Sequence, residues 1–166
     1  EGGRSAAGDG TRLEDHHAWD LPVRAPADGV VRRSVDGEPG AVLGEPRWGL
    51  AGLGNHVVIQ VAPDEFLFIG HLRRGTVAAA VGELVTAGQL LGRVGNSGNS
   101  SEPHVHVHLQ DTLRPYFGEA IPFYFSAYEQ DGRFVERGMP EGGRRGGRYV
   151  GQRVEQRRAD DPRAGT

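Results

Sequence analysis

Three histidines alternate along one short segment and are the first candidates for chemistry. They lie in Pro103-His104-Val105-His106-Val107-His108-Leu109. Side chains two residues apart lie on the same face of a β-strand, so His104, His106 and His108 are expected to share one surface. Two imidazoles about 6–7 Å apart along a strand can reach one small site, which suits a metal, or a metal and a base. We prefer this interpretation to an exposed polar strand face, because three histidines are in register.

A second candidate group lies near the N-terminus, where His16 and Asp20 are four residues apart. In an extended strand they would be ~13 Å apart, so only a bend or a helical turn would let them share a metal. His17 could also meet Asp20 on such a turn, so geometry leaves the choice of histidine open. With the His-x-His segment, this group would supply two histidines and one carboxylate. A fourth position would remain for water, as in catalytic zinc sites.

Two further histidines are interpreted as structural when each is taken alone, and two serines are not interpreted as nucleophiles. His71 ends an apolar run, and His56 opens another without a second partner nearby. Ser97 and Ser100 lie in a polar loop that is expected to form the rim of a substrate groove. Neither serine lies in the Gly-x-Ser-x-Gly context of a strand, a turn and a helix, so a serine hydrolase is not expected.

Together, these residues resemble the lysostaphin-like zinc metallopeptidases, bacterial enzymes that cleave peptide bonds in peptidoglycan. The family's His-x-x-x-Asp motif maps onto His16 and Asp20, and its His-Leu motif maps onto His71-Leu72. Its later His-x-His motif maps onto His104 and His106. The matching segments run in the family's order from His16 to about Leu109.

The resemblance implies a zinc ion, Zn2+, and a role for each matched residue. The implied metal ligands are His16, Asp20 and His106, with His71 and His104 as catalytic residues beside the metal. The family spacing of His to Asp selects His16 over His17. In contrast to many members, which have Tyr-x-His at the third motif, this chain has Ile69-Gly70-His71. The role of His108 is not explained by the resemblance.

The function implied is a zinc-dependent endopeptidase that hydrolyses peptide bonds of bacterial peptidoglycan through a metal-bound water. Zinc lowers the pKa of such a water from ~15.7 to ~7. The chain has no His-Glu-x-x-His motif to supply a glutamate base. His104 or His71 would therefore take the proton, and the other would orient the water or stabilise the oxyanion. The alternative is a non-catalytic family member that acts as a cell-wall binding or regulatory module; it is less favoured because all five positions carry a suitable residue.

The elements that must position these residues are predicted to be strands. The apolar segments between Val30 and Leu109 are short, β-branched and separated by turn residues. The predicted fold is all-β, a compact antiparallel sheet or barrel-sandwich hybrid with loops around a metal groove. The predicted strands are Gly29–Arg33, Asn55–Val61, Glu65–Leu72, Gln89–Val94 and Val105–Gln110.

Composition limits the other possibilities. There is no cysteine, so any zinc site must use histidine and carboxylate, and all 19 basic residues are arginine. Without lysine, a P-loop enzyme and a biotinyl or lipoyl carrier are excluded, although residues 81–90 have a carrier-like turn pattern. No apolar run reaches the roughly 20 residues that a membrane span requires.

Charge and glycine content divide the chain into three expected parts. From Asp131 onward nine arginines face six acids, a balance of +3, so the net charge of −3 leaves −3 − 3 = −6 for the residues before it. We expect a linker or lead-in at 1–10, a metallopeptidase domain at 11–130 and a basic, Gly/Arg-rich, disordered tail at 131–166. The sequence begins at Glu1, without a methionine or a signal-like segment, which suggests that it is a processed form or an excerpt of a longer protein. The expected partners are peptidoglycan peptides and not nucleic acid, and the expected location, from the family substrate, is extracytoplasmic: secreted, periplasmic or at the cell envelope.

Overall fold

The computed structural model of the chain describes residues 4–45, 52–140, 143–145, 148–150 and 154–156. The chain separates into two compact units, one formed by Ser5–Ile121 and the other by Pro122–Thr166 with Glu1–Arg4. In the described residues the only helical element is the 3₁₀ turn η1, Leu13–Asp15, and no helix there has the length and apolar character of a membrane span. The prediction of an all-β fold is therefore confirmed.

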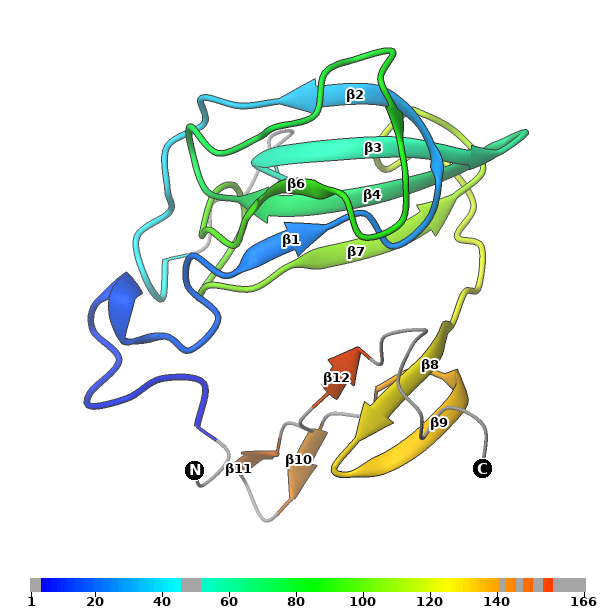
Figure 1. Cartoon of the computed structure of the whole chain (residues 1–166). Coiled ribbons are helices and arrows are strands. Elements are labelled where there is room, and N and C mark those ends of the chain that lie inside the picture. The colour runs from blue at the N-terminus through cyan, green and yellow to red at the C-terminus, as the bar shows by residue number, and fades with distance from the viewer. Residues whose placement is uncertain (1–3, 46–51, 141–142, 146–147, 151–153, 157–166) are drawn as a thin grey trace. The chain divides into compact units, whose positions relative to one another are not determined.

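The larger unit contains a five-stranded antiparallel sheet with the order β5-β2-β3-β4-β7. Figure 1 labels four of its strands, β2, β3, β4 and β7. Four of its strands were predicted from sequence with bounds that agree to within two residues. The fifth, β5, is only two residues long. The strands are β2 Gly29–Val35, β3 Asn55–Ala62, β4 Glu65–Leu72, β5 Leu84–Val85 and β7 His106–Gln110.

A second, two-stranded sheet pairs β1, Pro22–Arg24, with β6, Leu90–Arg93. The end of β6 is joined to the end of β4, because Leu72 and Val94 form an antiparallel bridge and Arg73 N–H donates to Arg93 O at 2.8 Å. The two sheets are thus joined where β4 and β6 end. The predicted strand Gln89–Val94 corresponds to β6, whereas β1 was not predicted.

Both faces of the central strands are buried, which explains their continuous apolar sequence. On one face Val58 pairs with Phe68 and packs with Leu53, and all three are at most 6% exposed. On the other face Val57 pairs with Ile69, and both are almost fully buried. Because side chains alternate along a strand, those of β4 are buried on both faces of the sheet. A residue of β7 lies on the same face as the β4 residue that it pairs with.

The second unit consists of short strands. β8, Phe125–Gln130, pairs with β9, Arg133–Gly138, and with β12, Val154–Gln156. β10, Gly143–Arg145, pairs with β11, Arg148–Val150. The remainder of the expected tail, residues 141–142, 146–147, 151–153 and 157–166, lies outside the described residues.

Candidate active site

Strand β7 places His106 and His108 on the face that carries Phe68. In the register of the β4 and β7 pair, His106 lies opposite Gly70 and His108 lies opposite Phe68. The His108 ring stacks on Phe68, with ring centroids 4.5 Å apart and an interplanar angle of 9°. Gly70 has no side chain to fill the space beside His106, and a Cβ there would lie 3.1 Å from Leu53. His106 and His108 thus lie on one face of β7, as predicted, whereas His104 precedes the strand.

His71 lies at the end of β4 in a left-handed backbone conformation, with φ of 64°. Few residues other than glycine adopt this conformation, and those that do are concentrated at functional sites. The backbone is held on both sides, because His71 N–H donates to Leu53 O at 2.9 Å and Gly95 N–H donates to His71 O at 3.0 Å. The result is a buried imidazole that contacts His104, at 4.6 Å between ring centroids, and His106, at 5.7 Å.

His104 precedes β7 and is exposed, in contrast to His71. Its Nδ1 lies 2.8 Å from Glu102 O, and the Nδ1 of His71 lies 2.8 Å from Ser97 O. A carbonyl oxygen can only accept, so in each ring Nδ1 carries the proton. Both histidines therefore keep an unprotonated Nε2, which is the form required of a base.

Burial favours the neutral form of His71, His106 and His108. Burial, with smaller effects from the neighbouring His104 and His106, lowers the pKa of His71 to about 4, and the bond to Ser97 O opposes this shift. Burial also lowers the pKa of His106 and of His108, and the charge of neighbouring histidines adds to the effect at His106. At neutral pH these imidazoles hold lone pairs rather than charge, so they can accept protons or bind a metal.

His16 is buried and His17 is exposed. The Nε2 of His16 lies 3.3 Å from Gly10 O, so this nitrogen donates. Its Nδ1 has no hydrogen-bond partner among the described residues, and the nearest carboxylate oxygen, on Glu102, is 3.8 Å away. A buried nitrogen with a free lone pair is uncommon and is a reason to look for a ligand.

Asp20 is joined to the two-sheet core but faces two arginines. It has φ of 60°, and its N–H donates to Val94 O at 3.0 Å. The carboxylate accepts from Arg73 at 2.6 Å and is 3.4 Å from Nη1 of Arg93. Within the described part of the chain, no hydrogen bond or ion pair joins the side chain of Asp20 to His16 or to the histidines of β7.

The donor types fit zinc, although the structure does not gather them around one point. Among the described residues, no three side chains of metal-binding type are arranged to hold a metal ion. The structure brings together His71, His104 and His106, but it does not join His16 or Asp20 to them. The chemistry still fits: His106 is a neutral imidazole, His16 has an orphaned Nδ1, and Asp20 supplies a carboxylate that is now held by arginine.

Sequence reasoning missed the polar network that holds His71 in place. Ser97 is 1% exposed, and its Oγ donates to Leu72 O at 2.8 Å while accepting from Asn55 N–H at 2.9 Å. Ser100 is equally buried and bonds to Asn96 and to Glu102 O. Both hydroxyls thus bond to other groups of the fold. The signal in the sequence was the run of small polar residues itself, which was interpreted only as a groove rim.

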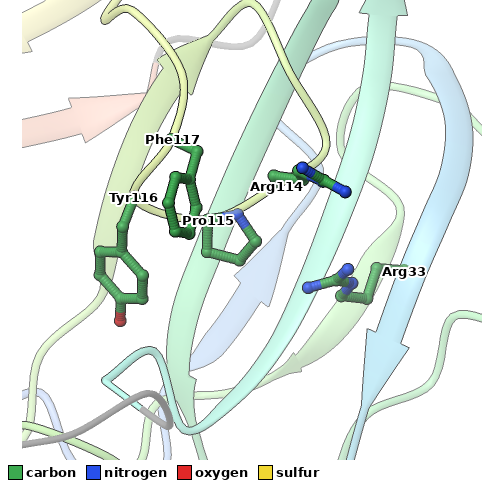
Figure 2. Close-up of a pocket in the computed structure, with 5 residues that line it drawn as sticks. All are labelled: Arg33, Arg114, Pro115, Tyr116 and Phe117. Atoms are coloured by element: carbon green, nitrogen blue, oxygen red, sulfur yellow. The ribbon is translucent and has the colours of Figure 1, made fainter.

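A separate hollow of about 300 Å³ follows the far end of β7. Figure 2 shows two guanidinium groups, from Arg33 and Arg114, on one side of it and the rings of Tyr116 and Phe117 on the other. Both aromatic residues are exposed, Phe117 by 78%. None of the predicted site residues lines this hollow, so it is distinct from the histidine cluster.

Comparison with known proteins identifies the family. The model of peptidase family M23 matches residues 9–116, and the chain therefore belongs to this family. Endolysin 2638A of Staphylococcus phage 2638A is 43% identical over 63 residues, which are 37% of this chain and only 13% of the endolysin. The match thus spans a small part of that relative.

Two solved structures illustrate the structural likeness. A mutant of the catalytic domain of the prophage-encoded M23 protein EnpA from Enterococcus faecalis is 26% identical, with a TM-score of 0.48, over 71% of this chain and 84% of that one. The antimicrobial peptidase lysostaphin from Staphylococcus simulans is 23% identical, with a TM-score of 0.46, over 61% of this chain and 38% of that one.

Proposed function

We propose that this M23 family member is a zinc-dependent endopeptidase that hydrolyses peptide bonds of bacterial peptidoglycan. The observation that carries the proposal is the pair of imidazoles on His71 and His104. Their rings are 4.6 Å apart, and each donates through Nδ1 to a backbone carbonyl, which leaves two Nε2 lone pairs in one place. Two oriented bases beside a metal-binding histidine are what metal-assisted hydrolysis requires.

The residues that would hold zinc are His16, Asp20 and His106. Bound zinc would activate a water molecule for attack on a peptide carbonyl. His16 is favoured over His17 because its buried Nδ1 is without a hydrogen bond, whereas His17 is exposed. For Asp20, binding would require its carboxylate to exchange Arg73 for the metal.

The two bases would divide the handling of protons. His71, with its pKa lowered to about 4, stays neutral at pH 7 and is a weak base, so its Nε2 orients the attacking water by accepting a hydrogen bond. His104 is exposed and can exchange protons with solvent, so its Nε2 takes the proton and later returns it to the leaving amine. The backbone bonds at Nδ1 would prevent either ring from turning during this transfer.

The substrate class follows from the family and from the phage relative, whose name describes a lytic enzyme. Peptidoglycan lies outside the cytoplasmic membrane, so the protein would act there: secreted, in the periplasm or at the cell envelope. The partners would be peptidoglycan peptides rather than nucleic acid.

One observation favours a second candidate, a non-catalytic cell-wall binding or regulatory module. The carboxylate of Asp20 is held by Arg73 at 2.6 Å and lies 3.4 Å from Arg93, and a carboxylate that stayed there would leave zinc with two protein ligands. Such a site would be expected to bind metal weakly or not at all.

Metal analysis combined with hydrolysis of purified peptidoglycan tests the proposal. We expect the full chain to bind one zinc ion and to release peptide amines. His106→Ala should lose both zinc and activity, whereas His104→Ala should keep zinc and lose about 10²–10⁴-fold in rate, the usual contribution of a general base. Wild-type protein that folds but takes up no zinc would favour the non-catalytic module.

The first ligand is tested by a matched pair of variants. His16→Ala should release zinc, and His17→Ala, one residue further on, should keep zinc and most of the rate. The reverse result would assign the ligand to His17 and leave the reaction class unchanged.

A further inference from the structure

His108 has no part in the proposed hydrolysis, yet its ring is held firmly. It stacks on Phe68 with ring centroids 4.5 Å apart, and it lies on the same face of β7 as His106 and Gln110. The stacking fixes the plane of the imidazole. Its two nitrogens therefore point in directions set by the fold, one toward His106 and the other toward Gln110.

The orientation of the Gln110 amide is determined by its neighbours. Its Nε2 donates to Thr112 O at 2.6 Å and to Arg114 O at 2.8 Å. Gln110 is 4% exposed, and Gly118 lies so close that a Cβ there would be 3.0 Å from the amide nitrogen. A reversed amide would place its oxygen against two carbonyl oxygens, so Oε1 must be the atom that faces His108.

This orientation fixes the proton on His108. Gln110 Oε1 lies 3.2 Å from His108 Nε2 and can only accept, so Nε2 carries the proton. His108 Nδ1 is then the acceptor for His106 Nε2, at 2.7 Å. The proton of a neutral His106 is consequently on Nε2, and its Nδ1 keeps a lone pair with no hydrogen-bond partner among the described residues.

We propose that Gln110 and His108 form a hydrogen-bond relay that fixes the tautomer of His106 and presents its Nδ1 to the metal. Both are positioning residues, because they act through His106 and do not touch the substrate. Histidines that bind a metal through one ring nitrogen usually donate the N–H of the other to a partner. That partner sets the tautomer and raises the basicity of the metal-binding nitrogen. The relay rests on the proposed function, because that function makes His106 a metal ligand; the tautomer itself follows from the hydrogen bonds.

The tautomer can be read in the metal-free full chain, without any assay of activity. Long-range ¹H–¹⁵N spectra of ¹⁵N-labelled protein at pH 7.5 should show the proton of His106 on Nε2 and that of His108 also on Nε2. A proton on Nδ1 of His106 in the wild type would overturn the relay, whether or not zinc binds. This spectrum also decides the question if a variant fails to fold.

Two substitutions at His108 separate hydrogen bonding from packing. His108→Phe keeps an aromatic ring to stack on Phe68 but has no acceptor, whereas in His108→Asn the amide oxygen can take the place of Nδ1. We expect His108→Phe to lose the fixed tautomer and to bind zinc about 10- to 100-fold more weakly in competition with a chelator. His108→Asn should keep the His106 tautomer and near wild-type zinc affinity.

The outcomes distinguish this proposal from the proposed function. If His108→Phe keeps both the tautomer and the affinity, the relay is wrong even when the enzyme is active. If wild-type protein shows the expected tautomer but takes up no zinc, the relay holds and the zinc peptidase is wrong. Equal weakening in His108→Phe and His108→Asn would indicate a packing role and would also overturn the relay.

Discussion

His56 lies outside the histidine cluster and shows what burial alone does to an imidazole. It opens β3 and is 9% exposed, and its Nδ1 donates to Gly54 O at 2.7 Å. Its Nε2 is buried without a hydrogen-bond partner among the described residues. Burial, with a smaller effect from Arg33, lowers the pKa of His56, while the bond to Gly54 opposes the shift. The folded protein therefore prefers the neutral ring.

This preference predicts how stability depends on pH. As the pH falls, His56 takes up a proton in the unfolded chain near the ordinary pKa of about 6.5. In the folded protein it takes up this proton only at a lower pH. The stabilising contribution is thus fully present above pH 6.5 and is lost as the pH falls toward the lower folded pKa. A single group changes the free energy of unfolding by at most about 1.4 kcal/mol per pH unit.

We expect His56→Asn to weaken this dependence, because the asparagine amide can still donate to Gly54 O but does not titrate. Urea unfolding of metal-free protein at pH 7.5 and pH 5 should show a smaller loss of stability on acidification in the variant than in the wild type. His17→Ala, at an exposed histidine, serves as the control. Equal losses in wild type and His56→Asn would contradict a buried neutral His56.

At the scale of elements, sequence predicted the strands that carry the site. Short apolar segments separated by turn residues located β2, β3, β4, β6 and β7, and the period of two placed His106 and His108 on one face. Strands β1 and β5, of three and two residues, carry too short a pattern to be recognised.

The contacts of Asp20 could not be predicted, because they depend on long-range folding. Its arginine partners are 53 and 73 residues away in sequence. Charge pattern along a chain carries no information about pairs at such separations. For the same reason, sequence could not show that the loop after β6 anchors the ends of β3 and β4 through Ser97.

Because Ser97 anchors the loop after β6, we expect Ser97→Ala to lower the stability of the fold. Ser97→Ala removes the acceptor of Asn55 N–H and leaves a fully buried donor unsatisfied, which costs about 1–3 kcal/mol. The free energy of unfolding from urea titrations should fall by that amount. Ser101→Ala, in the same loop but at an exposed residue, should change it by less than about 0.5 kcal/mol. Equal effects of the two substitutions would show that the network does not stabilise the loop.

At the scale of the whole molecule, the apolar core is concentrated in one unit. Every buried hydrophobic residue of the described chain except Tyr128 lies within Ser5–Ile121. The match to peptidase family M23, residues 9–116, also lies within this range. The unit closes on itself near its end, because Gln110 and Ala120 form a bridge and Ile121 N–H donates to Leu109 O at 2.9 Å.

This closure predicts that a chain ending at Ile121 folds alone, since it keeps the core, the histidine cluster and the turn over Gln110. Its melting temperature should match that of the corresponding unfolding transition in the full chain, and its zinc affinity should equal that of the full chain.

A chain ending at Asp111 is the matched control. It removes Thr112 O and Arg114 O, the two acceptors of the Gln110 amide, and Gly118, which packs against that amide. It should melt at a clearly lower temperature, because two buried hydrogen bonds are worth about 1–3 kcal/mol together. If the chain ending at Ile121 is unfolded and one ending at Gln130 folds, the domain extends to the boundary predicted from sequence, and residues 122–130 are part of it.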